Sequence, residues 1–517
     1  MDSFQPKHNK WLVTGSVMLG VFMSVMDITV VNVAMPHMMG NFGVDLLSVA
    51  WVSTAYSIAE IIMITMSHWW TVLLGRKRYF LLSMAVFMAG SILSGFAHSF
   101  AQIIIFRMIQ GIGGGGLIPC AQAIARETFP AEEQGMAMAV FSMGVIVAPA
   151  IGPVLGGWLV DHYGWPFIFF INIPICILAI AMTSAFVEDP PYLQRHFENI
   201  DAAGIGLLTV GLSLMQIVLE HGEEVDWFSS RWICFGAAGA VVALAAFVFW
   251  ELRVQDPVID FRLLKDPSLN AGCIIGAVVS VGLYGVGFLI PQWSQELLSY
   301  DATQSGLLLL PRAAMMFCLM PLVGRLYNKV SPRWMVLAGI AMLVMSYWLL
   351  ARLPLAVGFW TFLPAMVLGG AGMAFSMVAL STAALSRIPK KRMTAASGIY
   401  TLARRVSGNI AYAALGTVLA RRIQVHRFWL ARDASPFNAS YRAYSGAAVG
   451  YLRRFVGVSH ARVLEAALVN RMINRQASLM SYNDAFFIMA GLFALSIPLI
   501  VLLPRAGLPD AASAPAD

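Results

Sequence analysis

The sequence predicts an all-α integral membrane protein with about fourteen transmembrane helices. Of its 517 residues, 59% are hydrophobic and only 12% are charged, whereas a soluble domain carries about 25% charged residues. Apolar segments of about 20 residues, the length that crosses a bilayer, recur along the whole chain. We expect the helices at Trp11–Met35, Leu46–Ser67, Tyr79–Ala97, Ala101–Ala125, Met136–Val160, Phe167–Val187, Ala202–Leu219, Trp232–Trp250, Leu269–Pro291, Thr303–Leu326, Trp334–Ala351, Phe359–Leu385, Ala395–Ala420 and Phe486–Leu503.

The two halves of the chain look related, because a basic turn follows the second helix of each half. Gly75-Arg76-Lys77-Arg78 forms this turn in the first half, and Gly324-Arg325 occupies the matching place in the second. Parallel repeats of this kind predict two six-helix bundles around a central cavity. We expect the first bundle at residues 1–200, two extra helices at 201–252 and the second bundle at 253–517.

The short loops differ in charge on the two sides of the predicted membrane. If the N-terminus lies inside, the inner loops hold most of the basic residues, Arg76 and Arg253 among them, while the outer loops hold chiefly Arg231 and Arg352. Because Lys and Arg accumulate in cytoplasmic loops, both termini are expected in the cytoplasm. The acidic outer hairpin at 220–226 is expected to be a solvated face.

Segment 422–482 is expected to be a large outer loop between the last two helices. It holds nine arginines against Asp433 and Glu465, a balance of +7, which equals the net charge of the whole chain. The basic character therefore belongs to one loop and does not indicate nucleic-acid binding. Long loops translocate largely regardless of charge, so the topology stands. Within the loop, Tyr451–Met472 has helical periodicity with arginines on one side.

Asp27 is the only charge in the apolar segment Trp11–Met35. A carboxylate at the bilayer centre costs on the order of 3 kcal/mol, so it must face a polar cavity, pair with a cation or move protons. At 1.5 Å per residue, Asp27 lies about 12 Å from the outer surface and Arg107 about 10 Å. If their helices are neighbours, the two can pair and hold Asp27 ionised. A purely structural ion pair is the alternative.

Further polar side chains lie in apolar segments. Glu60, about 20 Å from the outer surface, is interpreted either as a second proton site or partner for cationic compounds, or as a packing carboxylate. Arg312 and Arg404 are expected to face the cavity, because an arginine in lipid is costly. His68, near the inner surface, is expected to be an interfacial residue rather than a proton relay.

Closely spaced glycines mark two helices. Gly111 and the tetrad Gly113–Gly116 lie inside an apolar segment with no preceding strand, so close helix packing explains them better than phosphate binding. In the fifth helix, Gly152-Pro153 and Gly156-Gly157 form a flat face, and proline permits a bend. The second pattern predicts a hinge whose packing also blocks leakage.

These stretches resemble the motifs of the fourteen-helix drug:proton antiporters of the major facilitator superfamily. The matching stretches are Met26–Pro36 in the first helix, Arg107-x-x-Gln110-Gly111 in the fourth, Gly144–Gly157 in the fifth, Ile168–Pro174 in the sixth and Arg404-x-x-x-Gly408-Asn409 in the thirteenth. Residues 223–230 and Trp250-Glu251-Leu252 are similar to the Gram-negative Emr-type branch. The resemblance covers residues 11–503 and is more specific for the family than for the branch.

The resemblance, taken with the buried charges, assigns roles to particular residues. The predicted proton-coupling residues are Asp27, Arg107 and Glu60. The predicted substrate-cavity residues are Asn32, Gln110, Arg312 and Arg404. The predicted conformational motifs contain Gly75, Arg76, Gly111, Gly152, Pro153, Gly156, Gly157, Gly324 and Arg325.

The inner-loop motif departs from the family pattern. The places of its opening Gly and its Asp-Arg pair hold His68 and Val72-Leu73, and the second copy has Asn328 for the Asp. In the family this motif latches the outward-facing state through a charge network. With both acids missing, the sequence does not predict the standard latch.

The resemblance implies proton-driven efflux of hydrophobic or amphipathic compounds across a bacterial inner membrane by alternating access. It also implies that segment 422–482 docks a periplasmic adaptor that leads to an outer-membrane channel; a solvated or lipid-headgroup-binding loop is the alternative. Membrane lipids surround the chain. No P-loop occurs, and the five cysteines lack metal-ligand spacing, so we expect no cofactor and no metal.

Three other functions compete with efflux of drugs as interpretations of the sequence. A dedicated exporter of an endogenous metabolite, lipid or siderophore would use the same scaffold. An uptake symporter is disfavoured, because the Gly152-Pro153 motif resembles that of antiporters. A membrane enzyme is disfavoured as well, because no metal cluster, paired carboxylates or serine elbow appears in the apolar segments.

Overall fold

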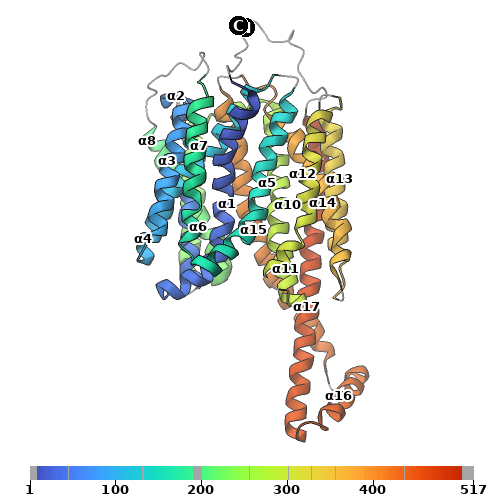
Figure 1. Cartoon of the computed structure of the whole chain (residues 1–517). Helices are drawn as coiled ribbons and strands as arrows, with labels where there is room; N and C mark the ends of the chain where they lie inside the picture. Colours follow the sequence, from blue (N-terminus) through green and yellow to red (C-terminus); the bar gives the residue numbers. More distant parts are fainter. Residues whose placement is uncertain are drawn as a thin grey trace.

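The structure is a computed structural model that describes residues 8–44, 46–130, 133–189, 201–254, 257–300, 302–327, 329–355, 357–389, 392–435 and 437–503. Within these ranges the chain is helical and contains no strand (Figure 1). Asn328 of the second inner-loop motif lies outside the described residues.

The helices follow one another along the chain as long rods joined by short turns. They are α1 (Lys10–Phe42), α2 (Leu46–Leu74), α3 (Arg76–Gly95), α4 (Phe100–Thr128), α5 (Gln134–Tyr163), α6 (Phe167–Phe170), α7 (Asn172–Phe186), α8 (Ala202–His221), α9 (Arg231–Glu251), α10 (Pro267–Leu298), α11 (Ala302–Leu307), α12 (Leu310–Leu326), α13 (Pro332–Leu350), α14 (Phe359–Ala384), α15 (Met393–Asp433), α16 (Ala439–Leu452) and α17 (Val458–Ser496). Short 3₁₀ turns lie at Glu223–Val225, Trp227–Ser229, Phe261–Lys265 and Ile497–Leu502.

The number of spans agrees with the sequence. In the described part of the chain, twelve helical stretches are long and apolar enough to cross a membrane, with α6 and α7 counted as one stretch. Helices α5 and α15 run through the same layer (Figure 1) and bring the number to fourteen. The prediction of an all-α membrane protein with about fourteen helices is confirmed.

Two sets of helices pack in the same pattern. Helices α1–α7, here called the N-terminal set, enclose one apolar core, and α10–α17, the C-terminal set, surround another. Helix α4 packs on α2 and α3 just as α14 packs on α12 and α13, and α5 packs on α1 just as α15 packs on α10. Equivalent helices thus occupy equivalent places in the two sets.

The sets meet along two seams, α2 against α15 and α5 against α12. At the second seam the backbones touch, because a Cβ atom built on Gly324 would lie only 2.8 Å from the carbonyl oxygen of Gly135. Small residues permit such close approach of helices in a membrane.

The glycines of α4 are packing residues. A Cβ on Gly113 would overlap the backbone nitrogen of Phe87 and lie 2.6 Å from the carbonyl oxygen of Ser83, both on α3. A Cβ on Gly111 would lie 2.9 Å from the Cβ of Ala59 on α2. The glycines therefore let α4 contact α2 and α3 through their backbones, as the packing interpretation predicts.

The hairpin between α8 and α9 is only partly the solvated face that its acidic residues suggested, because Asp226 is exposed but the start of the hairpin is buried. His221 is buried and stacks on Trp51 of α2, with ring centroids 5.1 Å apart. The indole Nε1 of Trp227 donates to Thr417 of α15 at 2.8 Å. The expectation was partly wrong because contacts with Trp51 and Thr417, which a count of charges ignores, pack this hairpin against both sets.

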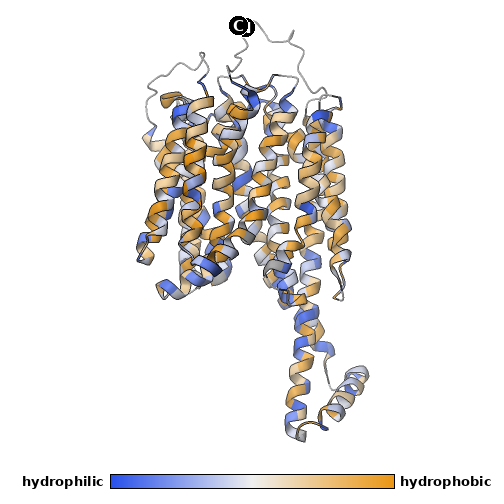
Figure 2. Ribbon diagram, in the orientation of Figure 1, coloured by the Kyte–Doolittle hydropathy of each residue, from blue (hydrophilic) through white to orange (hydrophobic). Residues whose placement is uncertain are grey.

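Segment 422–482 is also not a loop. Helix α15 continues without a break to Asp433 and has 41 residues, which at 1.5 Å per residue is about 60 Å, twice the thickness of the hydrocarbon core. The end of α15, helix α16 and the first half of α17 form a helical extension beyond the bundle. The extension lies at the end opposite the start of α1 (Figure 1). Polar residues are frequent along it, whereas the bundle is predominantly apolar (Figure 2).

The predicted helix Tyr451–Met472 is only partly correct. Helix α16 ends at Leu452, a turn follows, and α17 begins at Val458. The helical periodicity is correct for the start of α17. It does not mark the turn between α16 and α17, in which the chain reverses direction.

Replacing Gly113 with alanine should destabilise the protein. The added Cβ would overlap the backbone of α3, and overpacking of this kind costs about 1–3 kcal/mol. We expect a lower unfolding temperature for Gly113→Ala in detergent, measured by intrinsic fluorescence. The matched control is Gly206→Ala, because a Cβ there meets nothing within 4 Å; equal loss in both variants would contradict the packing role.

Candidate functional site

A buried ion pair joins α1 and α4. The guanidinium of Arg107 contacts the Oδ2 atom of Asp27 through Nη1 at 2.5 Å, and both side chains are 0–1% exposed. The pairing follows the prediction from their equal depths. Arg107 also lies over the ring of Tyr56, 4.3 Å from its centroid.

Amide side chains complete the environment of Asp27. Its Oδ1 atom accepts hydrogen bonds from Gln110 at 2.8 Å and from Asn172, at the start of α7, at 3.0 Å. Both amides also donate to Ser91 of α3. Both carboxylate oxygens of Asp27 therefore have hydrogen-bond partners.

The sequence singled out Gln110 for the substrate cavity, whereas in the structure it binds Asp27. Asn172 was read as part of a motif and was given no role. The sequence feature that could have identified Asn172 is a lone amide in an apolar segment, because a buried amide rarely lacks a hydrogen-bond partner.

A second buried ion pair joins the two sets. Arg405 of α15 contacts the Oε2 atom of Glu60 on α2 through Nη2, with side-chain exposures of 12% and 0%. The other amino group of Arg405 donates to the hydroxyl of Tyr284 on α10 at 3.1 Å. The second oxygen of Glu60 is buried and has no hydrogen-bond partner.

Sequence reasoning missed Arg405 and named its neighbour Arg404 instead. Arg404 donates from Nε to Ser280 at 3.2 Å and lies near the ring of Tyr400. Two adjacent arginines in an apolar segment were the available signal, but only the rotation of α15 against α2 decides which one reaches Glu60.

The remaining predicted cavity residues lie apart from both pairs. Arg312 is buried inside the C-terminal set and donates from Nη2 to the carbonyl oxygen of Gly282 at 3.2 Å. Asn32 is exposed and accepts a hydrogen bond from Ser53 at 3.3 Å.

The inner-loop motif keeps its basic residue engaged although its own acids are missing. Arg76 pairs with Glu127, in the last turn of α4, and donates from Nε to Thr394 of α15 at 3.1 Å. Asp189, which follows α7, accepts a hydrogen bond from the backbone N–H of Lys77 at 2.8 Å. Acids from other segments therefore take the places that the sequence showed as lost.

Gly75 and the second copy of the motif mark close contacts at the same end of the helices. Gly75 has a φ of 84° and no room for a side chain, because a Cβ would lie 2.5 Å from Asp189. Gly324 meets Gly135 across the second seam, while Arg325 beside it is exposed.

The glycine face of α5 packs beside Asp27. A Cβ on Gly152 would lie 3.0 Å from the Cβ of Thr29, and one on Gly156 would lie 3.0 Å from Val30, both on α1. Gly157 has only a distant neighbour, 3.9 Å away. The side chain of Pro153 lies outside what the structure describes.

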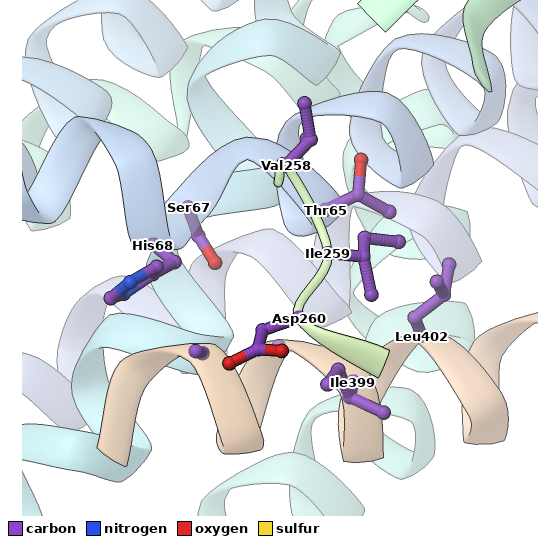
Figure 3. Close-up of a pocket in the computed structure, with 10 residues that line it drawn as sticks. Thr65, Ser67, His68, Val258, Ile259, Asp260, Ile399 and Leu402 are labelled. Carbon is purple, nitrogen blue, oxygen red and sulfur yellow. The ribbon is translucent and has the colours of Figure 1, made fainter. Parts of the chain in front are cut away.

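A small recess lies at the α2–α15 seam, near the start of α15 (Figure 3). It is lined by residues of α2, among them Ser67 and His68, by Ile399 of α15 and by Asp260 of the segment before α10. Asp260 also pairs with Arg392 at 3.2 Å. The described residues contain no group of three or more potential metal ligands.

Comparison with known proteins gives consistent matches over most of the chain. The family model described as Major Facilitator Superfamily matches residues 17–412. The multidrug export protein EmrB of Escherichia coli K12 is 32% identical over 499 residues, which cover 95% of this chain and 94% of EmrB. The fatty acid resistance protein FarB of Neisseria gonorrhoeae is 30% identical over 498 residues, 95% of each chain.

A solved structure shows the same fold. The human organic anion transporter MFSD10 (TETRAN) aligns with a TM-score of 0.62 at 15% identity, over 96% of this chain and all of that one. Together with the family match and the relatives at 30% identity or more, this shows that the chain belongs to the major facilitator superfamily and is a membrane transporter, not an enzyme.

Proposed function

We propose that this transporter exports hydrophobic or amphipathic compounds, drugs among them, from a bacterial cell in exchange for protons. The buried Asp27–Arg107 pair is the observation that carries the proposal. Ionisable groups inside a membrane are costly and typically serve ion pathways or proton relays. Relatives named multidrug export proteins support the substrate class.

Protons would act by changing the charge of Asp27. In its ionised form Asp27 holds Arg107 and both amides. A proton arriving from outside neutralises the carboxylate and weakens its hold on Arg107. One charge crossing the membrane supplies about 2.3 kcal/mol per 100 mV, and about 1.4 kcal/mol corresponds to a tenfold gradient, so one proton can sustain a gradient of tens-fold.

Alternating access would use the two seams. The contacts of Arg76 with Thr394 and of Gly135 with Gly324 join the two sets at the inner end, so they favour a state whose inner face is closed. The glycine face of α5 lies against α1 within a few residues of Asp27. A change in charge at Asp27 can therefore alter the packing of a helix that forms one of the seams.

A dedicated exporter of an endogenous metabolite, lipid or siderophore is the second candidate. The relative named fatty acid resistance protein favours a lipid-like substrate. A screen of lipophilic cations, weak acids and fatty acids in proteoliposomes separates the two candidates: stimulation by a single chemical class would favour the dedicated exporter.

The helical extension would dock a periplasmic adaptor that leads to an outer-membrane channel. We place both termini in the cytoplasm of a cell with an inner membrane, which puts the extension outside. Segment 422–482 carries nine arginines against two acids, and large apolar side chains are exposed on it, including Phe437 at 95% and Phe455 at 70%. Exposed aromatic and arginine side chains are enriched at protein interfaces.

Replacing Asp27 with asparagine should abolish proton coupling. The amide cannot titrate between the two charge states, so drug-stimulated proton movement in proteoliposomes should fall by at least about tenfold. The matched control is Asp161→Asn, which removes an exposed carboxylate at the outer end of α5. Full coupling in Asp27→Asn would refute Asp27 as the proton site.

Making the extension polar should weaken adaptor binding. We expect the double variant Phe437→Ser/Phe455→Ser to retain its unfolding temperature but to recover several-fold less adaptor in co-purification from the native host. The control is Phe228→Ser, an aromatic as exposed as Phe455 (68% against 70%) in the outer hairpin beside α9. Unchanged recovery in the double variant would count against docking through the extension.

A further inference from the structure

The two buried ion pairs differ in what they connect. Asp27 and Arg107 both belong to the N-terminal set, so their pair persists when the two sets move as rigid bodies. Glu60 lies on α2 and Arg405 on α15, on opposite sides of a seam. Movement of the sets away from each other at this seam must separate Glu60 from Arg405.

The pairs also differ in how completely the carboxylate is satisfied. Asp27 accepts from three side chains with both of its oxygens. Glu60 is bound through one oxygen only, and its Oε1 atom is buried without a partner. An unsatisfied buried carboxylate oxygen is unfavourable, and a proton on it would remove the negative charge.

Other charged and titratable groups surround Glu60 and have opposing effects. Arg405 and Arg107 contribute positive charge near its carboxylate, and Asp27 contributes negative charge. Tyr56 on its own helix and Tyr284, beside Arg405, are the nearby hydroxyl groups. Removal of Arg405 therefore takes away the partner that is in direct contact with the carboxylate.

The inner part of the seam closes next to this pair. A Cβ built on Gly398 of α15 would lie 3.3 Å from the hydroxyl of Ser67 and 3.4 Å from the carbonyl oxygen of Ile64, both on α2. Thr394 and Arg76 join one turn farther toward the inner end. The inner face can open along this seam only when the Glu60–Arg405 pair also parts.

We propose that Glu60 and Arg405 form a proton-sensitive bridge between the two helix sets, and that the inner face opens once Glu60 takes a proton and releases Arg405. The inference rests on the proposed proton-coupled function and assigns the conformational switch to the pair at the seam. A broken buried ion pair leaves an uncompensated charge, which makes opening unfavourable unless the carboxylate is neutral. Arg405 keeps its hydrogen bond to Tyr284 and remains with the C-terminal set.

The proposal can be tested by measuring the width of the inner face without any substrate. Spin labels at Arg78 and Lys329, exposed residues at the inner ends of α3 and α12, report this distance in the full-length protein after replacement of the native cysteines. In the wild-type background, lowering the pH should shift the distribution from short to long distances. A distribution that does not respond to pH would overturn the proposal.

Variants of the pair should change this response in different ways. We expect Glu60→Gln to favour the open population at least about tenfold at neutral pH and to lose the pH dependence. Arg405→Gln should move the transition to higher pH, because Glu60 loses its partner. Tyr284→Phe should give a smaller shift in the same direction, and it keeps the test informative if Arg405→Gln does not fold.

The charge-swapped variant Glu60→Arg/Arg405→Glu should restore the closed population and a pH response. One control separates the bridge from general loosening: Asp260→Asn removes another carboxylate near the seam and should leave the distribution unchanged. A wild-type response in Glu60→Gln, or an equal shift in Asp260→Asn, would refute the bridge. Because the distances are measured without substrate, failure of drug export would not affect this result.

Discussion

A charge placed within the apolar layer must find a partner there, and much of the interior of this transporter is arranged around that constraint. Asp27 meets Arg107 and two amides, and Glu60 meets Arg405. Buried pairs of this kind add little net stability, because desolvation offsets much of the attraction. Their presence is better explained by a change of charge or of partner during transport than by a contribution to folding.

The glycines of α4 determine how close the two pairs lie. Gly111 brings α4 against α2 beside Ala59, one turn from Arg107 and next to Glu60. Tyr56 fills the space between the two ion pairs, and its ring lies against the guanidinium of Arg107. A larger residue at Gly111 would push α2 outward, and with it one partner of the bridge to Arg405. Packing by small residues is therefore part of the electrostatic arrangement, not a separate feature.

The helices and the first ion pair could be predicted from the sequence, but the second ion pair could not. Depth along a helix follows from counting residues, so Asp27 and Arg107 could be matched before their helices were known to touch. Rotation about a helix axis depends on tertiary packing, which is why Arg405 was missed beside Arg404. The helical extension was mistaken for a loop because α15 remains helical after its sequence turns polar, and hydropathy reports only the apolar part. Val72 and Leu73 occupy the places of the motif's charged pair, so a local comparison finds no acid there. Glu127 and Asp189, which contact the motif, come from distant segments of the chain.

The extra helices add a constraint that the sequence did not suggest. Gln216 of α8 accepts a hydrogen bond from Asn409 of α15 at 2.6 Å, while His221 stacks on Trp51 of α2. These contacts lie on the outer side of the Glu60–Arg405 pair, and the contacts at Gly398 and Thr394 lie on its inner side. Separation of α2 from α15 at the inner end leaves α8 as the element that still links them. The Glu60–Arg405 pair therefore lies between an outer end that stays linked and an inner end that can separate. At this position, loss of a single contact has the greatest influence on whether the seam opens.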